Sequence, residues 1–160
     1  MSASLILQTN STRPSLLSPR PVLTGEVVHG DARGRTLGFP TANMEFSGEG
    51  LPAFGVYAVR VRDNDGPLPL LHNGVANFGI RPMFRTAEPL LETHLFDFQG
   101  DLYGQVLSVE LVAWLRPEVK FSGLEALVAQ IAADAARARH ILAVVHDHLA
   151  PGSDAQEIVA

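Results

Sequence analysis

The chain is organised around residues 25–43, GEVVHGDARGRTLGFPTAN. This stretch combines four glycines with two arginines, Arg33 and Arg35, and ends in the tetrapeptide PTAN. Glycines allow left-handed turns and let a ligand approach backbone N–H groups, and arginines bind phosphate oxygens with a fixed charge. The stretch therefore predicts a phosphate-binding loop, with a tight connection that uses glycine only for turns as the alternative. It contains neither the GxxxxGK[ST] pattern nor a GxGxxG between a strand and a helix.

The composition indicates an ordinary globular protein. The sequence has 160 residues, of which 46% are hydrophobic and 18% charged, and its formal net charge is −5. This length suffices for one hydrophobic core, and the negative charge argues against a nucleic-acid partner. The absence of cysteine excludes a disulfide framework and a thiolate metal site. No apolar run reaches the roughly 20 residues of a membrane span, so we expect a cytoplasmic monomer with no membrane partner.

Most of the chain predicts β-strands joined by short turns. Runs of β-branched and aromatic residues predict strands at residues 22–29, 54–62, 68–77, 91–98 and 105–115. Residues 80–89, which contain two prolines, are expected to form a loop. Because helices do not alternate with these strands, an antiparallel sheet or a closed barrel is expected.

The last predicted element is an amphipathic helix. Ser122 as N-cap and Glu125 at the third helical position predict a capping box. Apolar residues then recur at helical spacing, namely at Leu124, Leu127, Val128, Ile131, Ala135, Ala138, Ile141, Leu142 and Val145. We expect this helix to pack across the sheet and to stop before Pro151.

The two ends of the chain differ in composition from the middle. Residues 1–20 are rich in Ser, Thr and Pro and show no sustained period, and residues 151–160 are similar. We expect both to be mobile tails. Residues 21–150 are then a single domain.

Several segments resemble the riboflavin kinase (flavokinase) family, in the same order. They are the stretch at 25–43, GVANFGIRP at 74–82, ETHLFDFQGDLYG at 92–104, LRPEVKF at 115–121 and the final helix. The resemblance implies a six-stranded antiparallel Greek-key barrel with a C-terminal helix. It also implies transfer of the γ-phosphate of ATP to the ribityl 5′-hydroxyl of riboflavin, which gives FMN and ADP. Bacterial relatives often carry this module behind an adenylyltransferase domain; a complete gene product of this length would make FMN and stop there.

Phosphoryl transfer from ATP needs positioned phosphates, a hard cation and a base. Thr41 and Asn43 offer two oxygen ligands, and we expect a turn in PTAN to bring them together. The resemblance implies that both hold Mg²⁺, with Zn²⁺ or Mn²⁺ as replacements. It further implies nucleotide contacts by Gly30, Arg35, Gly38, Thr41 and Tyr103.

The motif ETH resembles the family segment that carries the general base, which would be Glu92 on a rigid strand. The alternative is a solvated glutamate or the partner of an arginine. Flavin contacts are implied for Arg116, Phe121 and Leu124, with core packing as the alternative for the two apolar residues. Lys120 either joins them or is a solvated cation. Met83 stands where many relatives have threonine, which removes a hydroxyl.

Other residues have simpler interpretations. Asn77 is as much to be expected as a turn residue, whose side chain bonds its own backbone, as it is to be expected in the site. His140, His146 and His148 are not spaced to share one helix face, which argues against a zinc site. His94 is expected to orient its neighbours through a hydrogen bond.

A rival interpretation is a non-catalytic carrier or regulator that binds flavin or nucleotide. The joint presence of Glu92, Thr41 and Asn43 argues against it, because a pure binder needs no base. A β-barrel that mediates only protein contacts is a third possibility. It would bind no flavin.

Overall fold

The computed structural model describes residues 15–30, 33–63, 72–81, 88–145 and 157–160. Within these residues its strands are β1 (Ser15–Leu16), β2 (Val22–Glu26), β3 (Ala42–Glu45), β4 (Gly55–Asp63), β5 (His72–Ile80), β6 (Pro89–Leu95), β7 (Val106–Arg116) and β8 (Glu157–Val159). Its helices are α1 (Arg33–Thr36) and α2 (Leu124–Val144). None of the helices in these ranges is long and apolar enough to cross a membrane.

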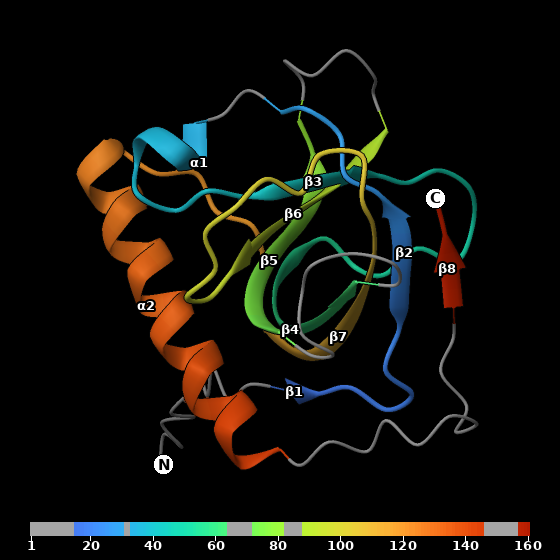
Figure 1. Cartoon of the computed structure of the whole chain (residues 1–160). Coiled ribbons are helices and arrows are strands. Elements are labelled where there is room, and N and C mark those ends of the chain that lie inside the picture. The colour runs from blue at the N-terminus through green and yellow to red at the C-terminus, as the bar shows by residue number, and fades with distance from the viewer. Residues whose placement is uncertain (1–14, 31–32, 64–71, 82–87, 146–156) are drawn as a thin grey trace, which may run out of the picture.

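The strands form one curled sheet in the order β3-β6-β5-β4-β7-β2-β8, with β1 paired to β7 (Figure 1). Every pairing is antiparallel except that of β2 with β8. Just beyond β2, Val28 bridges Asn43 of β3, so the two ends of the path from β3 to β2 meet. Since β3 lies beside β6 while β4, β5 and β6 are consecutive neighbours, the topology is a Greek key. The predicted mainly β class is confirmed, and β1 and β8 extend the six expected strands.

The sheet has a hydrophobic core on each face. The inner core gathers alternate residues of the curled sheet, among them Leu23, Met44, Phe46, Tyr57, Val59, Phe78, Leu91, Leu107 and Leu111. On the outer face, Ala138, Ile141 and Leu142 of α2 pack against Val56, Ala58, Val75, Val112 and Leu115. The expectation that the helix packs across the sheet is therefore confirmed (Figure 1). Only the C-terminal half of α2 is closely packed, because Leu127 and Ile131 border a cavity.

The predicted capping box of α2 is wrong. The N-cap is Gly123, whose φ of −178° and ψ of 175° are extended, and no side chain of the described residues forms a capping hydrogen bond there. The Leu127 N–H donates to the Gly123 carbonyl, so the helix begins one residue later than a Ser122 cap requires. At the other end, the buried Arg60 guanidinium donates to the carbonyls of Leu142 and Val145. Arg60 thereby satisfies carbonyls that the end of a helix leaves without partners.

Three other expectations change in the structure. Residues 42–45 form β3 instead of a loop, because Ala42, Met44 and Phe46 alternate into the inner core. Ile80 and Pro89 pair with each other as the ends of β5 and β6, whereas residues 82–87 lie outside the described part. Parts of both expected tails belong to the sheet, since Ser15–Leu16 pairs with β7 and Glu157–Val159 with β2. The domain boundaries themselves stay predictions.

Candidate active site

Three polar residues form a row across β3, β6 and β5. Glu92 is the direct partner of Asn43 on one side and of Asn77 on the other. Direct partners in antiparallel strands point to the same face. Thr41 leads into β3 two residues before Asn43, and extended residues two apart share a face. The turn expected to bring Thr41 and Asn43 together is therefore not needed, and Asn77 is a strand residue and not a turn residue.

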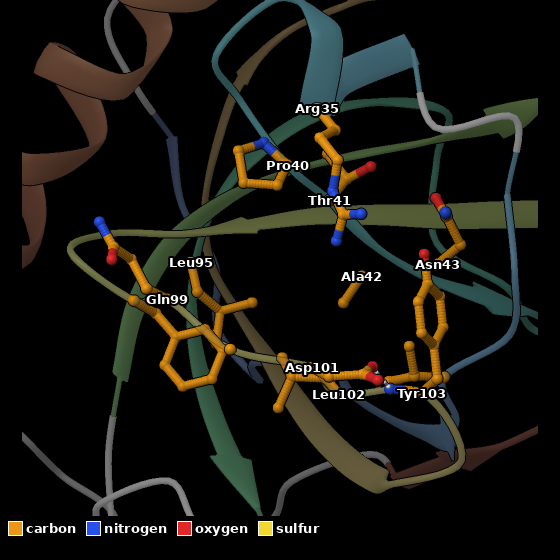
Figure 2. A pocket seen from close by; sticks show the side chains of 13 residues that line it. Arg35, Pro40, Thr41, Ala42, Asn43, Leu95, Gln99, Asp101, Leu102 and Tyr103 are labelled. Atoms are coloured by element: carbon orange, nitrogen blue, oxygen red, sulfur yellow. Dashed lines mark hydrogen bonds between the residues drawn. The ribbon is translucent and has the colours of Figure 1, made fainter.

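A first cavity, here called the loop cavity, has a volume of about 280 Å³. Its lining is Val27, Arg35, Pro40, Thr41, Ala42, Asn43, Leu95 and residues 98–103. Figure 2 shows Arg35 and Thr41 on one side of this space and Asp101 and Tyr103 on the other. The Tyr103 ring stacks on His29 with 3.7 Å between centroids, and its backbone N–H donates to Asp101 Oδ1 at 2.9 Å. Both contacts fix the position of Tyr103 at the cavity wall.

Asn43 has a buried side-chain oxygen. The residue is 5% exposed, and its Oδ1 accepts no hydrogen bond from any described group. A β-carbon on Gly30 would lie 2.1 Å from Asn43 Nδ2, so the absence of a side chain at Gly30 leaves room for the amide. Burying an oxygen without a donor is costly. The Asn43 oxygen, together with the nearby Thr41 hydroxyl, therefore suits a hard cation that prefers oxygen ligands.

A second cavity, the helix cavity, lies between the sheet and the first half of α2 and has a volume of about 360 Å³. Its apolar lining includes Leu37, Phe39, Val56, Val75, Val119, Phe121, Leu127 and Ile131. Its polar lining is Thr41, Asn77, Arg81, Glu92, His94, Arg116, Glu118 and Asp134. Thr41 lines both cavities, so the PTAN segment borders both spaces.

Glu92 is half-buried in the helix cavity and is paired with Arg81. The Arg81 Nε and NH2 atoms donate to Glu92 Oε2 at 2.9 and 2.6 Å. The third Arg81 nitrogen, NH1, donates to Glu118 Oε1 at 3.0 Å. Burial acts to lower the pKa of the Arg81 guanidinium, but its bonds and charge interactions with Glu92 and Glu118 raise that pKa above its ordinary value. Arg81 therefore stays positively charged between the two carboxylates.

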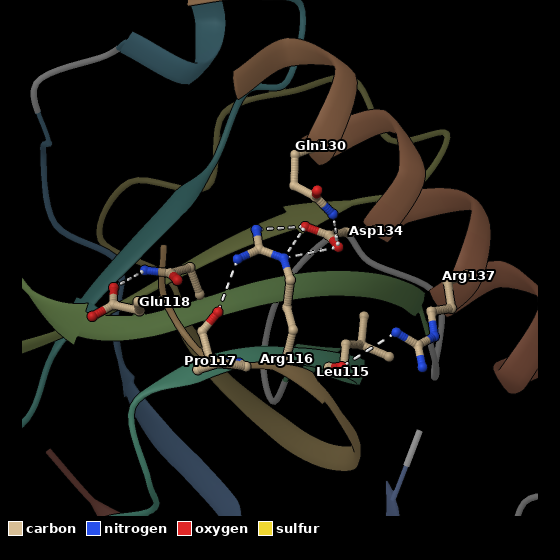
Figure 3. Close-up of polar contacts among 8 residues, drawn as sticks. Leu115, Arg116, Pro117, Glu118, Gln130, Asp134 and Arg137 are labelled. Carbon is tan, nitrogen blue, oxygen red and sulfur yellow. Dashed lines mark hydrogen bonds and ion pairs between the residues drawn. The ribbon is translucent and has the colours of Figure 1, made fainter. Parts of the chain in front are cut away.

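Arg116 is held by α2 (Figure 3). Its Nε and NH2 atoms donate to the Asp134 carboxylate at 3.0 and 2.7 Å, and its NH1 donates to the Pro117 carbonyl. Gln130 also donates to Asp134. The guanidinium lies 5.8 Å from the centroid of the Phe121 ring. Arg116 thus borders the helix cavity with most of its donors already used within the protein.

His94 contacts the backbone of the PTAN segment. Its Nδ1 lies 2.9 Å from the Pro40 carbonyl oxygen, and its ring meets Phe39 edge-on at 5.5 Å. This contact fits the expected orienting role. Among the described residues no group of three or more His, Cys, Asp or Glu side chains could hold a metal, and His146 and His148 lie outside them.

The predicted site residues fall into three groups. Arg35, Thr41, Asn43 and Tyr103 line the loop cavity, whereas Thr41, Glu92, Arg116 and Phe121 line the helix cavity. Gly30, Gly38 and Leu124 line neither: Gly30 lies against Asn43, Gly38 occupies a turn with φ of 86°, and Leu124 is 63% exposed. Lys120 is exposed. Arg33 lacks a described side chain, and Met83 is outside the described residues.

Sequence reasoning missed Arg81 and Glu118. Arg81 follows Asn77 by four residues, so strand alternation indicates that both share a face. A β-carbon on Gly79, between them, would lie 2.2 Å from Glu118 Oε1, so this glycine makes room for the carboxylate. Nothing in the spacing of Glu118 predicts that position, since it comes from a separate segment after β7.

Comparisons with known proteins identify the family of the chain. Residues 17–142 match the family model Flavokinase, described as riboflavin kinase. The chain is 45% identical over 115 residues to the bifunctional riboflavin kinase/FMN adenylyltransferase of Haemophilus influenzae, and 46% identical over 126 residues to that of Escherichia coli. These matches cover 72% and 78% of the chain, but only 36% and 39% of the relatives' length.

Two solved structures share the fold. A crystal structure described as a macrolide-efflux protein from Streptococcus pneumoniae is 33% identical, with a TM-score of 0.63 over 78% of this chain and 39% of that one. The crystal structure of riboflavin kinase from Trypanosoma brucei is 24% identical, with a TM-score of 0.52 over 77% of this chain and 80% of that one. At this identity the second likeness concerns the fold alone. From the family match and the identity to the bacterial relatives, the chain belongs to the riboflavin kinase family.

Proposed function

We propose that this chain is a riboflavin kinase that transfers the γ-phosphate of ATP to the ribityl 5′-hydroxyl of riboflavin. The observation that carries the proposal is that Thr41 lines both cavities, while Asn43 of the loop cavity and Glu92 of the helix cavity are direct strand partners. One cavity offers cation ligands and a cationic side chain, and the other offers a carboxylate and an apolar wall. A reaction between a nucleotide and an alcohol needs both.

The loop cavity takes the nucleotide. Arg35 supplies charge for phosphate oxygens, and Tyr103 supplies a fixed aromatic wall. Asn43 Oδ1 and the Thr41 hydroxyl hold the divalent cation, for which we propose Mg²⁺. When bound, the cation would offset the negative charge that develops on the phosphate oxygens.

The helix cavity takes riboflavin. Its volume of about 360 Å³ falls within the range of roughly 300–1,000 Å³ that is usual for small-molecule sites. Phe121, Leu127 and Ile131 provide an apolar wall for the isoalloxazine ring. Leu124 lies outside this lining, so its predicted flavin contact stays a prediction.

Glu92 is the proposed base. Both bonds from Arg81 end on Oε2, and no described residue donates to Oε1. Oε1 takes the proton of the 5′-hydroxyl as that oxygen forms a bond to the γ-phosphorus. The bond from the γ-phosphorus to the β,γ-bridging oxygen breaks, and ADP leaves with the electron pair. Glu92 then gives the proton to solvent.

The test is FMN formation by the purified protein with riboflavin, ATP and Mg²⁺. Separation of the flavins by chromatography should show FMN and an equal amount of ADP. A non-catalytic carrier would instead quench riboflavin fluorescence on binding. It would form no FMN with any nucleotide or divalent cation. A barrel that mediates only protein contacts would not quench the fluorescence. The monomeric state and cytoplasmic location expected from the sequence stay proposals.

A further inference from the structure

Glu92 and Glu118 share one guanidinium. Arg81 donates two hydrogen bonds to Glu92 Oε2 and one to Glu118 Oε1, at 2.6–3.0 Å. Glu118 is fixed in turn by Asn77 Nδ2, which donates to the same oxygen at 2.9 Å. Asn77 is the direct strand partner of Glu92, so three side-chain contacts and one backbone pairing link the four residues in a ring. The ring joins β5, β6 and the segment after β7.

We propose that Arg81 is a positioning residue for Glu92, held in place by Glu118 and Asn77. Two donors on one carboxylate oxygen fix both the position and the rotation of the carboxylate. Oε2 is therefore held by the protein, and Oε1 is left to meet the substrate hydroxyl. Glu118 orients Arg81 from the opposite side and acts on Glu92 only through it. This role rests on the proposed kinase function.

The Arg81 and Glu118 side chains are too exposed for their ion pair to contribute much to the stability of the fold. The Arg81 side chain is 37% exposed and that of Glu118 is 33% exposed. Ion pairs at such positions contribute little to folding stability. The free energy of unfolding should then depend weakly on Arg81, whereas the rate of a reaction that needs a fixed base should depend on it strongly.

The experiment compares Arg81→Met, Arg81→Lys, Glu118→Gln and the double variant Arg81→Met/Glu118→Gln with wild type. We expect kcat to fall about 10- to 100-fold in Arg81→Met, because a small displacement of a reacting group has an effect of this size. Arg81→Lys should recover part of the loss, since lysine keeps the charge but lacks the planar fork. Glu118→Gln should lower kcat by less than Arg81→Met.

The double variant separates the proposed chain of contacts from independent roles. If Glu118 acts only through Arg81, the double variant should be no slower than Arg81→Met alone. The Kd for riboflavin, from fluorescence quenching, should change by less than about three-fold, because positioning of a base acts on the transition state. Arg139→Met, which removes an exposed ion pair with Asp97 outside both cavities, is the matched control.

Three results would overturn the inference: unchanged kcat in Arg81→Met, multiplicative losses in the double variant, or a rise in riboflavin Kd that accounts for the loss in kcat/KM. Each requires that wild type forms FMN. Wild type that forms none would contradict the proposed function itself and, with it, any role of Arg81 toward a base. Thermal unfolding of every variant identifies losses that come from misfolding.

Discussion

Asn43 and Glu92 lie directly opposite each other on β3 and β6. Asn43 offers a buried oxygen, to which no described group donates, in the loop cavity, and Glu92 offers a carboxylate oxygen in the helix cavity. The two halves of the proposed reaction are thus attached to neighbouring positions of one strand pair. Backbone hydrogen bonds between the strands keep the cation ligand and the base in fixed register.

The first prediction concerns Asn43→Ala. Removing the amide should raise the Mg²⁺ concentration for half-maximal FMN formation by about ten-fold or more, since loss of a metal-site group has effects of this order. The free energy of unfolding should change little, because no described group donates to Oδ1 and would be left without a partner. A Mg²⁺ titration and a urea unfolding curve measure both. Thr24→Val, on β2, is the control and should leave the Mg²⁺ dependence of FMN formation unchanged. If Asn43→Ala also left that dependence unchanged, Asn43 would not be part of the cation site.

Gly30→Ala should disturb the same cation site without replacing either proposed cation-ligating residue, Thr41 or Asn43. The added β-carbon would lie 2.1 Å from Asn43 Nδ2, so the amide must turn away. We expect weaker Mg²⁺ activation with nearly normal unfolding, because the displaced group is the end of a side chain. Gly123→Ala is a matched control, since no described atom lies within 4 Å of its added carbon. Equal Mg²⁺ activation of the two variants would argue that Gly30 has no part in placing the Asn43 amide.

The buried Tyr57 hydroxyl should make the free energy of unfolding decrease at high pH. Burial raises the pKa of its hydroxyl from 10.0 to about 12, and the hydroxyl donates to the Ala53 carbonyl at 2.5 Å. Because folding raises this pKa, the protonated Tyr57 hydroxyl contributes its full stabilisation below pH 10, where it is protonated in both states. The contribution is lost as the pH rises toward 12, because the unfolded chain loses this proton first. The contribution is about 2–3 kcal/mol, from roughly 1.4 kcal/mol for each pKa unit. Urea unfolding at pH 9 to 11.5 should show a smaller loss in Tyr57→Phe than in wild type, and equal slopes would contradict the assignment.

The fold was largely predictable because it depends on short-range patterns. β4 and β7, for example, are almost continuous runs of apolar and β-branched residues, and such runs predict buried strands without knowledge of their partners. β3 was missed because its four residues follow a glycine-rich segment, and its strand pairing is only visible beside β6. β8 was missed because three exposed or half-exposed residues carry no pattern until β2 offers its edge.

The candidate site was less predictable than the fold. The resemblance supplied Thr41, Asn43 and Glu92, but the contacts that hold them come from distant segments. Arg81 and Glu118 meet across 37 positions of the chain, and no local pattern encodes that contact. The position of Leu124 was also unpredictable, because its helical spacing matches that of the buried residues while it lies on the first, exposed turn of α2.

The measurement that tests the account most directly is the single-turnover rate of FMN formation by Glu92→Gln, with riboflavin, ATP and Mg²⁺ at saturation. Loss of the base should slow the chemical step by about 10²- to 10⁴-fold. Binding should be unaffected, so the protein should still quench riboflavin fluorescence as wild type does. Glu26→Gln, an exposed glutamate of β2, is the matched control and should react like wild type. A Glu92→Gln protein that forms FMN at the wild-type rate would contradict the assignment of Glu92 as the base.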